Sequence, residues 1–155
     1  MKVVAPLEVG LVAGDIAALL AFYQEALDCK LLTDISAPAE VSRRAGLSAD
    51  GYRVIRLETL GGDRFKLAQP LGELRESVRD PHPIFRAGCA YLTFIVDDLM
   101  AIASRVQMAG GRMHSQGVVT LRPGVSMFLA TDPEGNWLEF VHYDDIRSYR
   151  PTARA

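Results

Sequence analysis

The chain has 155 residues, of which 49% are hydrophobic and 23% charged, and its formal net charge is −2. This length suits one domain or two small modules that share a core, and the composition is ordinary for a soluble globular protein. A near-neutral chain without a basic run argues against a nucleic-acid surface, and no apolar run approaches the ~18 to 20 residues that span a membrane. Cys29 and Cys89 have no metal or redox spacing and no apolar signal segment precedes them, so we predict a cytoplasmic protein.

The first half of the chain predicts a strand, a helix and three further strands. Asp15 is a good N-cap residue, and apolar residues at helical spacing follow it, so a helix is expected at about residues 15–27. The segment 36–51 is expected to be a loop that can hold a short helical turn, and the proline-rich, charged segment 70–86 is expected to be a linker. Alternating patterns predict strands at residues 7–12, 29–33, 52–58 and 64–68.

The second half predicts the same succession of elements. Asp98 is an N-cap for a helix that ends at Gly110-Gly111. Asp-Pro and Gly-Asn within residues 132–136 predict a tight reversal between the last two strands. The remainder, residues 144–155, is polar and is expected to be a surface tail. Strands are expected at residues 89–96, 112–115, 118–121, 126–131 and 137–142.

The two halves align with each other at fixed offsets. The stretch 12–16 matches 95–99 at an offset of 83, and 62–66 matches 135–139 at an offset of 73. Each half is therefore predicted to be a β-α-β-β-β module of about 65 to 70 residues, too small to bury a good core alone. The fold class predicted from this repeat is α+β, with module one at about 5–70 and module two at about 87–143. Their curved sheets are expected to form one cleft.

Three stretches resemble the vicinal oxygen chelate superfamily of glyoxalases, bleomycin-resistance proteins and extradiol dioxygenases. The opening Glu8-Val9-Gly10-Leu11-Val12 with Asp15-Ile16 and Ala21-Phe22-Tyr23 is similar to the start of its first module. Tyr91-Leu92-Thr93-Phe94-Ile95-Val96-Asp97-Asp98 is similar to the start of its second module, and Asp132-Pro133-Glu134-Gly135-Asn136-Trp137-Leu138-Glu139 to its closing hairpin. The resemblance implies a single domain over residues 1–155, a small-molecule substrate or ligand, and a homodimer.

In this superfamily four residues, two from each module, converge at the bottom of the cleft. The repeat offsets place them here at Glu8, Lys66, Tyr91 and Glu139. Metal-dependent members have His, Glu or Gln at these points, and this chain departs from that pattern. A protonated lysine has no lone pair, and a tyrosine phenol titrates near ~10, so neither suits a divalent cation at neutral pH. We expect no cofactor; if a divalent metal is bound, Glu8 and Glu139 are its expected ligands.

Glu139 lies between large apolar neighbours on its strand and is expected to need a partner, since an unpaired carboxylate in a dry place costs several kcal/mol. The predicted partner is Lys66, in a Glu8–Lys66–Glu139 cluster of net charge −1. Two carboxylates around one ammonium titrate together, which allows one of them a raised pKa suited to proton transfer. Tyr91 would then donate a hydrogen bond to a substrate oxygen. The alternative is a former metal site converted into a structural salt bridge beneath a binding pocket.

Four further residues are candidates for substrate binding. Trp137 either stacks on a flat ligand or belongs to the core. Arg56 is placed to bind a carboxylate from the first sheet, and His114 follows a glycine pair in a strand of the second module. Arg122 either reaches an anionic substrate from a turn or is a solvated loop charge.

These residues predict a glyoxalase-like enzyme, a lyase or isomerase that transfers a proton on an oxygenated organic substrate without a metal. The alternative from another class is a non-catalytic, bleomycin-resistance-like protein that binds a drug or other small molecule. A metal-dependent dioxygenase would require a His-His-Glu set that the chain lacks.

Overall fold

The computed structural model describes residues 3, 5–75, 81–85 and 87–151. Residue contacts divide the chain into two compact units, residues 1–77 and residues 78–155. Each unit has one mixed sheet with a helix packed on it, so the predicted α+β class with two β-α-β-β-β modules is confirmed. None of the helices in the described ranges is long and apolar enough to cross a membrane.

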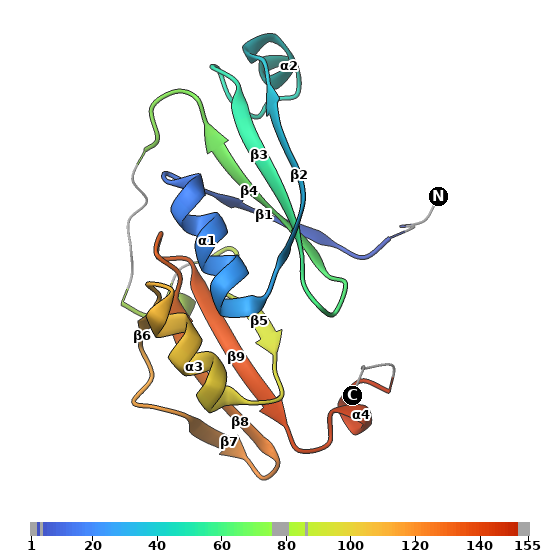
Figure 1. Ribbon diagram of the computed structural model, residues 1–155, viewed down its shortest axis with the longest axis vertical. Helices are drawn as coiled ribbons and strands as arrows, with labels where there is room; N and C mark the ends of the chain where they lie inside the picture. The colour runs from blue at the N-terminus through green and yellow to red at the C-terminus, as the bar shows by residue number, and fades with distance from the viewer. Residues whose placement is uncertain (1–2, 4, 76–80, 86, 152–155) are drawn as a thin grey trace. The chain divides into compact units, whose positions relative to one another are not determined.

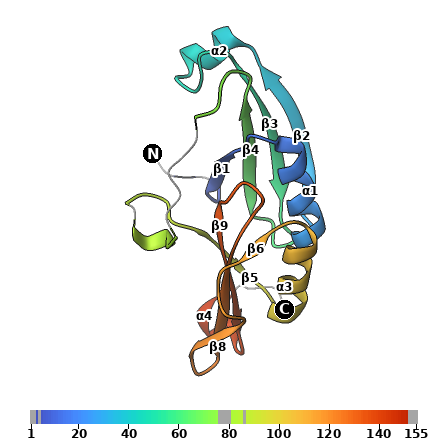
Figure 2. The same cartoon turned by 90° about the vertical axis from the view of Figure 1, so that its left-hand side faces the viewer.

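The first unit is a four-stranded sheet with one face covered by a helix (Figure 1). The strand order is β1-β4-β3-β2; β1 and β4 run parallel and the other neighbours antiparallel. A second, short helix lies at one end of this sheet (Figure 2). In chain order the elements are β1 (Glu8–Val12), α1 (Ile16–Leu27), β2 (Lys30–Ala37), α2 (Ala39–Arg44), β3 (Tyr52–Glu58) and β4 (Arg64–Pro70).

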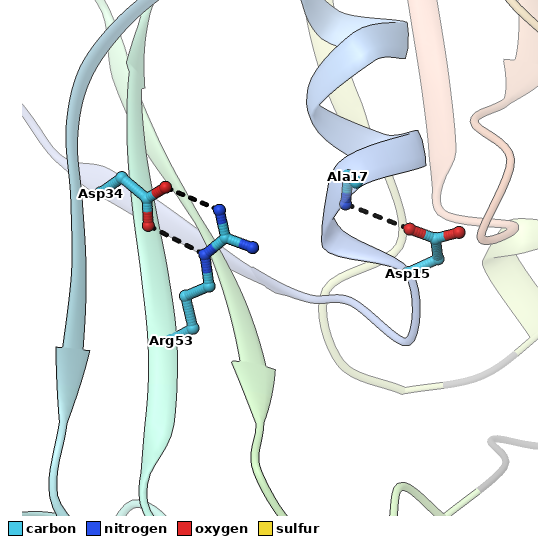
Figure 3. Close-up of polar contacts among 4 residues, drawn as sticks. All are labelled: Asp15, Ala17, Asp34 and Arg53. Carbon is cyan, nitrogen blue, oxygen red and sulfur yellow. Dashed lines mark hydrogen bonds and ion pairs between the residues drawn. The ribbon is translucent and has the colours of Figure 1, made fainter.

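Helix α1 begins where the sequence predicts. The Asp15 carboxylate accepts hydrogen bonds from the backbone N–H groups of Ala17 and Ala18 at 3.1 and 3.0 Å, which satisfies two donors left free by the first turn. The bond from Ala17 is drawn in Figure 3. The inner side of the helix buries Phe22 and Tyr23 completely, and the Tyr23 ring meets Phe65 of β4 edge-on at 4.8 Å. These aromatic contacts attach the helix to the sheet and define the buried face of β4.

The second unit repeats this plan with an additional strand. The sheet order is β5-β9-β8-β6, and β7 pairs with β8. Phe128 and Phe140 are fully buried with their rings 4.8 Å apart, and Phe94 stacks on Phe140 at 5.7 Å. The elements are η1 (Pro83–Phe85, a 3-10 turn), β5 (Leu92–Ile95), α3 (Leu99–Met108), β6 (Arg112–Met113), β7 (Val119–Arg122), β8 (Val125–Thr131), β9 (Trp137–Tyr143) and α4 (Ile146–Tyr149).

The strand registers reproduce the internal repeat. Gly10 pairs with Lys66 in the parallel β1–β4 ladder, and Thr93 pairs with Glu139 in the parallel β5–β9 ladder. Thr93 lies 83 residues after Gly10, and Glu139 lies 73 residues after Lys66, which are the two offsets found in the sequence. The turns before β4 and β9 also correspond, since Gly62 and Gly135 both have positive φ, 90° and 83°.

Several predicted boundaries are wrong. Strand β2 continues to Ala37 and is followed by α2, although residues 36–51 are predicted to be a loop. The pairing of Ala37 with Tyr52 of β3 extends β2, and this partner is invisible to a local pattern. Pro70 ends β4 instead of opening a linker, and β5 begins at Leu92 instead of residue 89. Residues 76–80 and 86 of the predicted linker lie outside the described residues.

The predicted polar tail contains helix α4. Asp145 caps this helix by accepting a hydrogen bond from the Ser148 N–H at 3.2 Å. The Tyr149 ring stacks on Tyr143 of β9 with ring centres 4.6 Å apart. The start of the tail is therefore packed onto the sheet of the second unit.

Candidate functional site

In each sheet the predicted site residues lie on the face that the helix leaves open. Side chains alternate along a strand, so Leu138 and Phe140 of β9 are buried on the helix side while Trp137 and Glu139 project from the opposite face. In β4, Phe65 packs on α1 and Lys66 projects the other way. Each unit therefore presents one open sheet face with a charged residue in its last strand.

Glu139 has its hydrogen-bond partner in the neighbouring strand. The Thr93 hydroxyl donates to Glu139 Oε2 at 2.7 Å, and the two residues are paired in the β5–β9 register. Among the residues that the structure describes, Thr93 is the one that forms a hydrogen bond with the Glu139 carboxylate. Thr93 is not among the predicted site residues; it is equivalent to Gly10 at the offset of 83, but only the observed strand pairing places it opposite Glu139.

Glu139 also lines a cavity of about 330 Å³ in the second unit. Most of the wall is apolar or aromatic, and Tyr91, the residue predicted to donate to a substrate, contributes its side chain as well. His82 is also part of this wall, and its ring centre lies 5.0 Å from that of Phe85. From the sequence, where His82 stands between two prolines, no site role was predicted for it. The lining residues are His82, Pro83, Ile84, Phe85, Tyr91, Leu129 and Glu139.

Trp137 and His114, both predicted to bind substrate, contact each other. Their ring centres are 4.2 Å apart, and His114 Nε2 lies 3.3 Å from the Thr131 hydroxyl. Burial lowers the pKa of His114 below its usual 6.5, and the nearby positive charge of Arg112 lowers it further. The imidazole is therefore neutral near pH 7. In this form it can make a hydrogen bond with the Thr131 hydroxyl while its ring packs against the Trp137 indole.

Arg122 ends β7 opposite Val125, which in turn pairs with Tyr143 of β9. Burial raises the pKa of the Tyr143 phenol, the hydrogen bond with Tyr149 raises it further, and the charge of Arg122 acts in the opposite direction. The structure therefore places Arg122 beside a tyrosine pair, on an exposed strand instead of in the predicted turn.

In the first unit Lys66 and Glu8 form an ion pair. Lys66 Nζ lies 3.0 Å from Glu8 Oε2, and both side chains are about one-third exposed, at 37% and 32%. The hydrogen bond from Lys66 is the main reason why the pKa of Glu8 lies below its usual 4.5, and the charges of Lys66, Arg56 and Arg64 add to it against a smaller effect of desolvation. The lysine reaches along β1 to Glu8 because its direct partner in the register, Gly10, has no side chain.

Of the predicted Glu8–Lys66–Glu139 cluster, two residues, Glu8 and Lys66, belong to the first unit. The Glu8–Lys66 contact is present, and the pKa of Glu8 is lowered, so Glu8 is not the carboxylate with a raised pKa. The contact between Lys66 and Glu139 joins residues of two different units and stays a prediction.

The chemistry of these side chains does not fit a divalent metal ion. Lys66 stands at a position where the resemblance implies a ligand, and its ammonium is held by Glu8 with no lone pair to offer. In the described part of the chain, no group of three or more His, Cys, Asp or Glu side chains is placed to hold a metal.

Comparisons with known proteins agree with this architecture. A profile of the Glyoxalase/Bleomycin resistance protein/Dioxygenase superfamily matches residues 5–140. No curated protein sequence matches the chain significantly. Among solved structures, a glyoxalase family protein from Bacillus cereus superposes with a TM-score of 0.80 at 18% identity, covering 92% of this chain and 96% of that chain.

Two further structures share the fold at lower similarity. Glyoxalase I from Zea mays has a TM-score of 0.64 at 18% identity over 90% of this chain and 44% of its own. The fosfomycin resistance protein from Listeria monocytogenes, complexed with Mn(II), has a TM-score of 0.58 at 10% identity, covering 91% of this chain and 93% of that chain. At such identities the likeness shows the fold alone.

Proposed function

Because the chain belongs to the Glyoxalase/Bleomycin resistance protein/Dioxygenase superfamily, we propose that it is a glyoxalase-like enzyme that transfers a proton on an oxygenated organic substrate without a metal. The observation that carries this proposal is Glu139, a carboxylate that lines a mostly apolar cavity and is oriented by the Thr93 hydroxyl. The cavity volume of about 330 Å³ is at the lower end of the range for small-molecule sites.

In the proposed reaction Glu139 is the base. Its Oε1 takes a proton from a carbon next to a substrate carbonyl, while Thr93, a positioning residue, holds Oε2 through its 2.7 Å hydrogen bond. The electron pair of the broken C–H bond moves onto the carbonyl oxygen, to which the Tyr91 hydroxyl donates a hydrogen bond. Where the deprotonated carbon carries a hydroxyl group, return of the proton to the former carbonyl carbon, with the hydroxyl proton passing to the former carbonyl oxygen, gives an isomerase. Loss of a leaving group from the carbon on the other side of the deprotonated carbon gives a lyase. The apolar wall strengthens these polar contacts by excluding water.

The proposal assigns the positive charge near the substrate to Lys66 in place of a metal. Its support is the Glu8–Lys66 ion pair at a position where the resemblance implies metal ligands. Elemental analysis of the purified protein tests this part: one equivalent of zinc, nickel, iron or manganese, lost in both Glu8→Ala and Glu139→Ala, would overturn it. A metal content that is the same in those variants and the wild type, or below one-tenth of an equivalent, would support it.

A binding protein is the second candidate, because the cavity wall combines a carboxylate with aromatic side chains. Phe85 and Tyr91 offer ring faces, and Glu139 offers a negative charge, which together suit a flat cationic compound. In this reading the Thr93–Glu139 hydrogen bond is structural, and no bond of the ligand is broken.

Solvent deuterium incorporation distinguishes the two candidates. The protein is incubated in D₂O with a panel of 2-oxoaldehydes, their hemithioacetals, 2-hydroxyketones and 3-oxoacids, and loss of each C–H signal is followed by proton NMR. The enzyme proposal expects exchange that falls at least about a hundredfold in Glu139→Gln and is unchanged in the matched control Glu40→Gln, an exposed residue of α2.

Binding without exchange would favour the second candidate. A planar cationic dye that binds the wild type and Glu40→Gln equally, and Glu139→Gln much more weakly, with no exchange in any panel compound, is the outcome expected of a binding protein. We also propose a homodimer, as the resemblance implies, which light scattering coupled to size-exclusion chromatography tests directly.

A further inference from the structure

The open face of the first sheet carries a row of two adjacent cations. In the register, Lys66 of β4 pairs with Gly10 of β1 on one side and with Arg56 of β3 on the other, and Arg56 pairs with Thr33 of β2. These four residues cross the whole sheet in one line. A Cβ atom added to Gly10 would meet nothing within 4 Å, so the end of the row beside Lys66 is open space.

Arg56 is the cation of this row whose charge is not neutralised by a partner. Its Nη1 lies 3.5 Å from the Thr33 hydroxyl, and in the described part of the chain no carboxylate forms an ion pair with it. Lys66, by contrast, is paired with Glu8 at 3.0 Å, and Arg64 with Glu58 at 2.7 Å. A guanidinium has five N–H donors in a fixed fork, so most of the donors of Arg56 remain available to an anion.

The rows on either side differ in character. One neighbouring row alternates acid and base: Glu8, Arg64, Glu58 and Lys30. It lies two residues away along β1, β4 and β3, and three residues away along β2, whose register shifts between Leu31 and Thr33. With Lys66 and Arg56 this gives four basic and two acidic side chains, so these two rows carry a formal charge of +2 on a chain whose net charge is −2. An anion at Arg56 is therefore attracted by the face as a whole.

The row on the other side of Arg56 is entirely apolar. It consists of Val12, Ala68, Val54 and Ile35. Val12 and Ile35 are 58% and 49% exposed, whereas Val54 between them is 6% exposed, so the uncovered hydrophobic surface of this row lies at its two ends. Residues two apart on a strand are about 7 Å from each other, the length of a few methylene groups. A ligand with its anionic group on Arg56 would thus lay a short hydrocarbon segment on this row.

We propose that the open face of the first sheet binds an organic anion with an apolar body, its carboxylate or phosphate group on the Arg56 guanidinium and the Lys66 ammonium, and its hydrocarbon part on the exposed side chain of Ile35 in the neighbouring apolar row. The site is argued from the first unit alone, and it stands whether or not Glu139 transfers a proton.

The chain provides a matched control for Arg56 in the same strand. Arg53 of β3 pairs with Gln69, on the helix side of the sheet, and its guanidinium donates to both oxygens of Asp34 at 2.9 and 2.6 Å (Figure 3). Both residues are half-buried arginines of β3. Arg56 lies on the open face of the sheet and Arg53 on the helix side, and of the two only Arg53 has its charge neutralised by a carboxylate among the described residues. The proposal depends on these two differences.

The test is a titration of the full-length, isotope-labelled protein, followed by amide chemical shifts, with hexanoate, its neutral analogue hexanamide, and acetate. Hexanoate is expected to shift amides of β3 and β4 and to bind at least about tenfold more tightly than either hexanamide or acetate. Arg56→Met should remove the preference for hexanoate over hexanamide, and Arg53→Met should leave it unchanged. Ile35→Asn should reduce the preference for hexanoate over acetate without changing acetate binding.

Equal binding of hexanoate and hexanamide by the wild type would overturn the proposal, as would equal losses in Arg56→Met and Arg53→Met. Shifts confined to the second unit would assign hexanoate to the cavity beside Glu139 and would also overturn it. Circular dichroism and thermal melting establish that each variant is folded. Should Arg56→Met fail to fold, Arg56→Lys keeps the charge but loses the fork, and it is expected to bind hexanoate severalfold more weakly than the wild type; unchanged binding would count against the site.

Discussion

The last strand of the first unit presents Lys66 where the last strand of the second presents Glu139, although both strands pair with their neighbours in the same register. Lys66 finds its partner two residues along β1, at Glu8, because Gly10 beside it has no side chain. Glu139 finds its partner directly across the ladder, at Thr93. One scaffold thus holds a cationic row in one unit and an acidic, mostly apolar site in the other.

The comparison shows that the strand register and the side chains of the open face are determined by different interactions. A slip of one residue would exchange Leu67 and Lys66, or Phe140 and Glu139, between the two faces, so the buried pattern fixes the register. On the opposite face of the second sheet Val125, Met127 and Val141 form a small buried cluster, but the charged side chains Lys66 and Glu139 are only half-buried and have no such packing to satisfy. Their charges can therefore change sign between the two units without any change in strand pairing.

The largest expected effect comes from equivalent positions on the buried faces. Leu67 and Phe140 correspond at the offset of 73, and both are 0% exposed. Phe140→Ala should lower the free energy of unfolding by about 3 to 5 kcal/mol, and Leu67→Ala by about 2 to 5 kcal/mol, because each leaves a cavity under a helix. Urea unfolding followed by circular dichroism measures both, and a loss below about 1 kcal/mol for Phe140→Ala would contradict the packing described.

A smaller effect is expected at the two equivalent turns. Gly62 and Gly135 have φ values of 90° and 83°, which L side chains adopt at a cost. Gly62→Ala and Gly135→Ala should each destabilise the protein by about 1 to 2 kcal/mol in urea unfolding. Gly10→Ala is the control, since Gly10 has no positive φ and open space at its Cβ. A loss at Gly10 as large as at Gly62 would show that the backbone conformation is not the cause.

The smallest expected effect concerns the ion pair that the second unit lacks. The pKa of Glu8 is lowered chiefly by the hydrogen bond from Lys66, so Lys66→Met should raise it toward 4.5. Since the folded-state pKa lies below the unfolded value, the pair stabilises the protein above about pH 4.5, and this contribution is lost as the pH falls through the folded-state pKa.

Carbon-13 NMR titration of the Glu8 carboxyl measures this shift. The control is Arg53→Met, which should raise the lowered pKa of Asp34 and leave that of Glu8 in place. An unchanged Glu8 titration in Lys66→Met would mean that the ion pair is absent in solution.

Local patterns predicted the elements that depend on neighbouring residues. The strand Tyr52–Glu58 has the predicted bounds, and Asp15 and Asp98 cap their helices as expected, because alternation and capping are properties of a few consecutive residues. The short helix α2 lies in the loop for which a helical turn was predicted, but the end of β2 escaped these patterns, since the pairing of Ala37 with Tyr52 depends on a strand that begins fifteen residues later. For the same reason Thr93 was not predicted as the partner of Glu139.

The sequence by itself determined the family, the duplicated β-α-β-β-β plan and the positions equivalent to Glu8, Lys66, Tyr91 and Glu139, because periodic burial and repeated turns are written along the chain. The contact of Lys66 with Glu8 belongs to the cluster that the sequence predicted, whereas only the tertiary structure decided that Thr93 meets Glu139 and that His82 joins the cavity wall. Such contacts depend on strand order across the sheet and on the course of the connecting segment. Two residues that are 46 positions apart, as Thr93 and Glu139 are, become neighbours only when the sheet has formed.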